Sequence, residues 1–221
     1  MELIHTYYEP AGAGPHPTIV ALHGWGASAL DLIGLAPYLA GGSFQVICPQ
    51  GAITVPLGGA TGFGWFPLTS GGQVADGATI ARAADALRDF LERARERYPI
   101  DPRKLVLLGF SQGGVLAYVI ALGDPTRFAG LAALSSWLPP TLAAALPTDE
   151  ARRQLTTLVQ HGSDDGIIAV ARARQSVETL RGLGVPLTYR EYAMGHEING
   201  ASLSDLSAWL AEKILSPIIL L

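Results

Sequence analysis

The chain has 221 residues, of which 49% are hydrophobic and 15% charged, with a formal net charge of −4. This composition excludes a disordered chain and a basic face for binding nucleic acid, and the length predicts a single domain covering residues 1–221. Because the opening MELIHTYYEP lacks a secretory signal and no run nears the roughly 20 apolar residues of a membrane span, we expect a cytoplasmic protein without stable membrane insertion.

Short apolar runs recur between glycines and prolines and predict buried strands. In chain order they lie at 17–24, 44–51, 104–110, 131–136, 155–162 and 187–193. Several lack alternation, which is typical of parallel strands covered on both faces by helices. The stretch LIHTYY near the N-terminus alternates instead and fits an edge strand. The one cysteine, Cys48, lies in the second of these runs, and we interpret it as a buried hydrophobe.

Helical patterns lie between these strands. The first begins after Asp76, a suitable N-cap, and stops before Pro99; a second runs from about Val170 to Arg181. A third places one apolar face along Leu203, Leu206, Leu210 and Ile214. The order of strand, helix and strand predicts the α/β class, with a mostly parallel central sheet and helices on both faces.

One connection, at about 52–75, is long, rich in glycine and without sustained periodicity. Loops of this length usually carry a function. We interpret it as a flap or wall beside an apolar substrate cleft, with Trp65, Phe66 and Leu68 in contact with the substrate. A surface loop anchored by its aromatic side chains is the alternative.

The stretch GFSQGG at 109–114 follows a predicted strand and precedes the helix-like segment VLAYVIAL. The pattern G-x-S-x-G alone is a weak signal, but this setting is the one required of a nucleophile elbow. Such a turn cramps the serine backbone, so we expect Gly109 and Gly113 to leave room for Ser111 and its hydroxyl to project at the carboxyl edge of the sheet. A tight glycine-rich turn around a buried serine is the alternative.

A serine hydroxyl needs a base to take its proton, and the base needs an acid to hold its tautomer. In this architecture both follow the serine, with the acid before the histidine. Of the two histidines after Ser111, His161 precedes the acidic residues, so the order selects His196. Asp164 and Asp165 lie in the turn after the preceding strand, and spacing alone does not separate them.

An oxyanion hole needs two backbone N–H groups aimed at the developing charge. One is expected from Gln112, directly after the serine, and the other from the loop HGWG at 23–26, where we choose Trp25.

The same loop also matches the sequence pattern of a dinucleotide-binding turn. Gly24, Gly26 and Ala29 fit G-x-G-x-x-A after a strand, but the next strand ends in CPQGA, without an acidic residue for a ribose. We therefore expect no cofactor and no metal.

Together these residues resemble the phospholipase/carboxylesterase family of α/β-hydrolases, which includes the acyl-protein thioesterases. The similarity covers nearly the whole chain and rests on LHGWGAS, AITVPLGGATGFGWF, GFSQGG, LAALSSWLP, HGSDD and MGHEI, in the family's order. The resemblance implies an α/β-hydrolase fold, with Ser111 as nucleophile and His196 as base. Because the family places its acid third after HG, it implies Asp165 as the acid, and it supports Trp25 and Gln112 as oxyanion donors.

The chain also departs from the family pattern. Pro67 follows Trp65-Phe66 where relatives often carry an aspartate, and Trp25 replaces a common leucine. We expect the indole of Trp25 either to narrow the acyl end of the cleft, which favours short or medium acyl groups, or to pack against the lid.

The sequence therefore predicts a serine carboxylesterase that hydrolyses small-molecule esters through an acyl-enzyme intermediate. Acyl-protein thioesterase or lysophospholipase activity with the same residues is the alternative, and a non-catalytic binding module is the rival of another class. The apolar end SPIILL at 216–221 is too short to span a bilayer. We expect it to pack against the protein's own surface or against the second subunit of a homodimer; contact with a membrane surface is the alternative.

Overall fold

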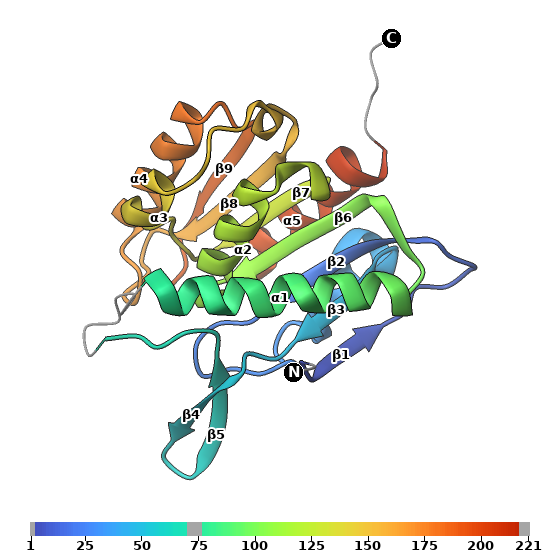
Figure 1. The fold of residues 1–221 in the computed structure, drawn as a ribbon, viewed down its shortest axis with the longest axis horizontal. Helices are drawn as coiled ribbons and strands as arrows, with labels where there is room; N and C mark the ends of the chain where they lie inside the picture. Colours follow the sequence, from blue (N-terminus) through green and yellow to red (C-terminus); the bar gives the residue numbers. More distant parts are fainter. Residues whose placement is uncertain (1–2, 70–76, 217–221) are drawn as a thin grey trace.

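A computed structural model describes residues 3–69 and 77–216 of the chain. Across these residues, seven strands form one sheet in the spatial order β1-β3-β2-β6-β7-β8-β9 (Figure 1). In chain order these strands are β1 (His5–Tyr8), β2 (His16–Leu22), β3 (Gln45–Pro49), β6 (Ile100–Phe110), β7 (Gly130–Leu134), β8 (Thr156–Gly162) and β9 (Leu187–Tyr192). Neighbouring strands run parallel except β1, which pairs antiparallel with β3 at the edge. The expected mostly parallel sheet with an N-terminal edge strand is confirmed.

Helices cover both faces of this sheet, as the alternating pattern predicts. One face carries α1 (Gly77–Arg97), α2 (Gln112–Gly123) and α4 (Val170–Gly182). The other carries the 3-10 segment η1 (Ile33–Gly42) and α5 (Gly200–Leu210), which continues into a π-helical turn (Ala211–Leu215). Shorter helical segments are η2 (Pro125–Arg127), α3 (Pro140–Ala144) and η3 (Glu150–Gln154). Figure 1 shows α1 and α2 in front of the sheet and α5 behind it.

The buried strands carry apolar side chains on both faces because both faces are covered. Along β6, Leu105 and Leu107 belong to the core that includes α1, α2 and α4. The intervening Val106 and Leu108 belong to the core that includes η1 and α5. This division explains why the strand sequences read as continuous apolar runs.

The helix α1 has the expected extent and amphipathic character. Its apolar stripe, which includes Ile80 and Leu87, is buried, and Arg97 in the last turn complements the helix dipole. Asp76, the expected N-cap, lies outside the described residues.

Cys48 is buried within β3 and is a free cysteine. Burial raises the pKa of its thiol to about 12, so the thiol is protonated at neutral pH. The interpretation of this residue as a small buried hydrophobe is confirmed.

The connection expected at 52–75 is more ordered than the sequence analysis supposed. It contains an antiparallel hairpin, β4 (Ile53–Leu57) and β5 (Ala60–Gly64), whose two-residue turn is Gly58-Gly59 with φ angles of +55° and +109°. Two glycines between strand-like runs are a known hairpin signal, because both turn residues need positive φ. Figure 1 shows the hairpin projecting from the body of the molecule. Residues 70–75 of the connection lie outside the described part.

In the described part of the chain, no helix combines the length and the apolar character needed to cross a membrane. The apolar end SPIILL extends beyond Ser216, and residues 217–221 lie outside the described residues. Its packing therefore stays a prediction.

Candidate active site

Ser111 occupies a sharp turn between β6 and α2. Its backbone has φ +53° and ψ −119°, a region that residues other than glycine rarely adopt. Its neighbours hold this conformation: the N–H of Ser111 donates to the carbonyl of Leu134 at 2.9 Å, and the Ser136 hydroxyl donates to the carbonyl of Ser111 at 2.7 Å. The end of β7 and the residues after it therefore support the turn.

The glycines around Ser111 are required by space. A Cβ atom on Gly109 would lie 2.3 Å from the carbonyl oxygen of Gly113, and one on Gly113 would lie 2.2 Å from the carbonyl oxygen of Leu22. The expected steric role of both glycines is confirmed. Gly114 is equally constrained, because a Cβ there would lie 2.5 Å from the side chain of Ser136.

The structure brings the serine, the selected histidine and one of the two aspartates together. His196 Nε2 lies 2.9 Å from Ser111 Oγ, and His196 Nδ1 lies 2.7 Å from Asp165 Oδ2. The side chain of His196 is 18% exposed, whereas the carboxylate of Asp165 is fully buried. Asp164 is exposed, and its carboxylate accepts a hydrogen bond only from Ser163 among the described residues.

Asp165 is held in its charged form by hydrogen bonds. Burial raises the pKa of its carboxyl, but the hydrogen bond from His196 and those from the backbone N–H groups of Ile168 and Ile167 lower it more, and the net shift is downward. Both backbone bonds reach Oδ1 at 2.8 Å, which leaves Oδ2 for the imidazole. The carboxylate is thus ionised and oriented at neutral pH.

His161, the histidine that chain order rejects, is fully buried beside the same carboxylate. Its Nε2 donates to the carbonyl of Ile168 at 2.7 Å and lies 3.2 Å from Asp165 Oδ2. Its Nδ1 has no hydrogen-bond partner among the described residues. His161 therefore contacts the turn that carries the acid, and His196 contacts the serine.

The HGWG loop lies directly against the serine turn. A Cβ on Gly24 would lie 3.3 Å from the Cβ of Ser111. Within residues 3–69 and 77–216, neither the backbone N–H of Trp25 nor that of Gln112 donates a hydrogen bond to the protein, whereas the next one, of Gly26, donates to the carbonyl of Phe63. The backbone N–H groups of Trp25 and Gln112 are therefore free donors among the described residues, and they lie on the two segments that meet at Ser111.

The side chain of Gln112 joins the serine turn to the segment that follows the hairpin. Its Oε1 accepts the backbone N–H of Trp65 at 2.8 Å, and its Nε2 donates to the carbonyl of Phe66 at 2.6 Å. The indole N–H of Trp65 donates to the carbonyl of His23 at 2.9 Å. The HGWG loop and the first residue of α2, which carry the free donors, are thereby both fixed to one short segment.

His23 completes this network as a neutral imidazole. Its Nδ1 donates to the carbonyl of Gly24 at 2.7 Å, and its Nε2 accepts the N–H of Gly51 at 3.0 Å. Burial lowers the pKa of His23, which outweighs the opposing effects of the Gly24 carbonyl and of Asp31. Protonation of Nε2 would remove the lone pair that accepts the hydrogen bond from the Gly51 N–H.

The burial of Trp65 and Phe66 fits the alternative, a loop anchored by its aromatic side chains, and their expected contact with a substrate stays a prediction. Trp65 is 5% exposed and Phe66 is fully buried, so both belong to the core and offer a ligand almost no surface. Leu68 is half-buried against the same core, and its contact with a substrate stays a prediction. Trp25 is 38% exposed, and its indole covers Gly64, where a Cβ would come within 2.5 Å of the ring.

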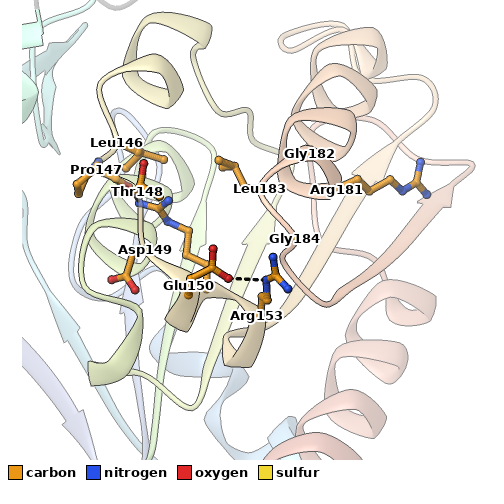
Figure 2. A pocket seen from close by; sticks show the side chains of 11 residues that line it. Leu146, Pro147, Thr148, Asp149, Glu150, Arg153, Arg181, Gly182, Leu183 and Gly184 are labelled. Carbon is orange, nitrogen blue, oxygen red and sulfur yellow. Dashed lines mark hydrogen bonds and ion pairs between the residues drawn. The ribbon is translucent and has the colours of Figure 1, made fainter.

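A cavity of about 300 Å³ lies away from these residues, between the segment before β8 and the end of α4 (Figure 2). Because its walls precede β8 and β9, it opens at the amino ends of the strands, opposite Ser111. Figure 2 shows an ion pair between Glu150 and Arg153 inside it, 2.9 Å long. Arg152 donates to the carbonyls of Leu122 and Pro147. Arg181, also in the wall, pairs with Glu178 of α4. These charged groups of the cavity wall thus already have partners within the protein.

A second cavity, of about 220 Å³, flanks the candidate site. Its walls are Asp31, Leu32, Leu35, Phe110 and Ile198. The Phe110 ring lies 5.0 Å from the His196 ring, between centroids. No role was expected for these wall residues, for Ser136 or for the Gln112 side chain. They lie in or near the site motifs along the chain, and this proximity was the signal that could have indicated them. Nowhere in the described residues do three or more His, Cys, Asp or Glu side chains group to hold a metal ion.

Known protein families and solved structures include matches to this chain. The phospholipase/carboxylesterase family matches residues 8–214. The chain is 34% identical over 118 residues to acyl-protein thioesterase 1 of Gibberella zeae. This aligned stretch covers 52% of this chain and 50% of that protein. It is 27% identical over 158 residues to a probable SOBER1-like carboxylesterase of Arabidopsis thaliana. This alignment covers 69% of this chain and 60% of that protein. The matched part thus spans about half the length of these relatives.

Among solved structures, esterase PE8 superposes with a TM-score of 0.79 at 24% identity, covering 96% of this chain and 100% of that one. At this identity the likeness concerns the fold. The expected α/β-hydrolase fold is confirmed.

We predict that Gly109→Ala lowers the free energy of unfolding by about 3 kcal/mol, because the new methyl group would meet backbone atoms that cannot move aside. Urea denaturation followed by circular dichroism measures the change. The matched control is Gly182→Ala at the end of α4, where a Cβ meets nothing within 4 Å, and it should shift stability by less than about 1 kcal/mol. Equal stability of the two variants would contradict the steric argument.

We also predict that Gln112→Ala loosens the segment after the hairpin. The change leaves the Trp65 N–H and the Phe66 carbonyl without partners, which costs about 1–3 kcal/mol for each buried group. Hydrogen–deuterium exchange of the peptide containing Trp65 should become faster than in the wild type. Gln175→Ala, at an exposed position of α4, serves as control. Unchanged exchange in Gln112→Ala would refute this role of the Gln112 side chain.

Proposed function

This chain belongs to the phospholipase/carboxylesterase family, and on that basis we propose that it is a serine carboxylesterase acting on small-molecule esters. The observation that carries the proposal is the continuous series of contacts from Ser111 Oγ through His196 to Asp165, at 2.9 Å and 2.7 Å. The names of the relatives, a carboxylesterase and an acyl-protein thioesterase, support the same class of chemistry.

In the acylation step, His196 Nε2 takes the hydroxyl proton of Ser111 while Oγ attacks the ester carbonyl carbon. The carbonyl oxygen becomes an oxyanion, which accepts hydrogen bonds from the free backbone N–H groups of Trp25 and Gln112. When the tetrahedral intermediate collapses, His196 gives its proton to the leaving alcohol oxygen. The acyl group stays bonded to Ser111.

Deacylation repeats these steps with water as the nucleophile. His196 takes a proton from the water, the resulting hydroxide attacks the acyl carbonyl, and the same two N–H groups stabilise the oxyanion. His196 then returns the proton to Ser111 Oγ, and the carboxylic acid leaves. These steps use the groups of this chain and water.

Asp165 acts on the reaction through His196. As the acceptor of Nδ1–H, it holds the tautomer in which Nε2 can take the serine proton, and its charge stabilises the imidazolium that forms. The lowered pKa of Asp165 keeps this charge present at neutral pH.

The exposed indole of Trp25 supports a preference for short or medium acyl groups. Its contact with Gly64 of β5 corresponds to the alternative, packing against the connection at 52–75, so the proposed preference rests on the part of the ring that remains exposed. Activity on p-nitrophenyl esters of increasing acyl length tests this preference.

Three alternative hypotheses from the sequence can be tested beside this proposal. Thioesterase action on acylated proteins and lysophospholipase action would use the same residues, and a panel of esters, thioesters and lysophospholipids separates them. A non-catalytic binding module would fail to react with a fluorophosphonate probe. The single domain over 1–221, the cytoplasmic location and the homodimer stay predictions.

We predict that Ser111→Ala lowers kcat/KM on p-nitrophenyl butyrate on the order of 10³-fold or more, because the nucleophile is lost. The variant should unfold at a urea concentration close to that of the wild type. Substantial remaining turnover would mean that another group attacks the ester.

A second prediction separates the two neighbouring aspartates. Asp165→Asn should lower kcat/KM by roughly 10³-fold, because the amide no longer holds the active tautomer of His196. Asp164→Asn, at an exposed position next to it, should remain within about twofold of wild type. A larger loss at position 164 would refute the assignment of the acid.

A further inference from the structure

The cavity of about 220 Å³ beside the candidate site has walls from three separate segments. Asp31, Leu32 and Leu35 come from η1 and the residues just before it. Phe110 directly precedes the nucleophile, and Ile198 follows the base by two positions. Two of its five wall residues are therefore close in sequence to the proposed nucleophile and base.

The proposed chemistry determines which part of an ester lies on this side. The carbonyl oxygen must point to the free N–H groups of Trp25 and Gln112, whereas the alcohol oxygen must face His196, which protonates it. The Phe110 ring lies 5.0 Å from the His196 ring. Resting on the proposed esterase function, we propose that this cavity binds the alcohol part of the substrate, and that it takes short apolar alcohols without negative charge.

The size and lining of the cavity define the alcohol. A volume of 220 Å³ equals that of about seven water molecules in the liquid, so it accommodates an alkyl or aryl group of about seven carbon atoms. Leu32 is buried, and Leu35, Phe110 and Ile198 are half-buried, which gives apolar walls for such a group. A benzyl group fits this description.

Asp31 supplies the charge selection at this cavity. It is exposed, and within the described residues its carboxylate makes no hydrogen bond or ion pair. An unpaired carboxylate repels a negatively charged leaving group and tolerates neutral or positively charged ones. Alcohols that carry a carboxylate or a phosphate should therefore be poor leaving groups, which disfavours lysophospholipids as substrates.

The kinetics allow the alcohol site to be tested separately from the acyl site. The alcohol leaves during acylation, so kcat/KM depends on the alcohol, whereas hydrolysis of a given acyl-enzyme does not. The experiment uses butyrate esters of methanol, benzyl alcohol and 4-(hydroxymethyl)benzoate, which share one acyl group.

For the wild type, kcat/KM should be about tenfold higher for the benzyl than for the methyl ester, from burial of the ring. Leu35→Trp fills the cavity, so the benzyl-to-methyl ratio should fall about tenfold. Tyr38→Trp on the same segment η1, which does not line this cavity, is the matched control and should keep the ratio. Ile198→Ala enlarges the cavity and should raise kcat/KM for 2-naphthylmethyl butyrate relative to benzyl butyrate.

The charge selection is tested with Asp31→Asn. The ratio of kcat/KM for the carboxylated benzyl ester to that for the benzyl ester should rise about threefold to tenfold at low salt. Asp89→Asn, an exposed position on α1, should leave this ratio unchanged. An unchanged ratio in Asp31→Asn would overturn the role of this carboxylate.

The outcomes separate this inference from the proposed function. If a fluorophosphonate labels Ser111 and esters are hydrolysed, but Leu35→Trp and Ile198→Ala alter selectivity for acyl length and not for the alcohol, the cavity holds the acyl group and the inference is overturned. If neither labelling nor hydrolysis occurs, the proposed function falls, and the inference with it. Urea denaturation of each variant shows that the comparison concerns folded protein.

Discussion

The candidate site depends first on one strained residue. A positive φ at Ser111 costs on the order of 1–3 kcal/mol, so the turn exists only because its neighbours enforce it. The flanking glycines leave the required space, and the bonds to Leu134 and Ser136 tie the turn to the next strand. This strained conformation places the Ser111 hydroxyl within hydrogen-bonding distance of His196, which in turn contacts Asp165.

The parallel sheet supplies the second constraint. Strands that run in one direction end at one edge, and β2, β6, β8 and β9 each deliver a site residue there. Ser111 and His196 are 85 positions apart in sequence, yet their side chains come within hydrogen-bonding distance. Because the sheet is covered on both faces, this edge is held by two separate cores.

The sequence predicted the sheet, the major helices, Ser111 and His196, because periodicity and chain order carry that information locally. It left Asp164 and Asp165 unresolved, since only the family resemblance separated neighbours of the same chemistry. It also missed the Gly58-Gly59 turn, and it did not indicate that Trp65 lies in the core, because an aromatic residue in a glycine-rich connection can be either an anchor or a contact surface. The hydrogen bond between the Gln112 side chain and Trp65 joins positions 47 residues apart, so no local sequence pattern could have indicated it.

Gln112 has two tasks, with a free backbone N–H at the serine and a side chain that holds the base of the hairpin. The hairpin tip at Gly58 and Gly59 lies beyond this attachment. Changes in the length or sequence of this tip can therefore alter the projecting hairpin while Ser111 and the free N–H groups of Trp25 and Gln112 keep their places.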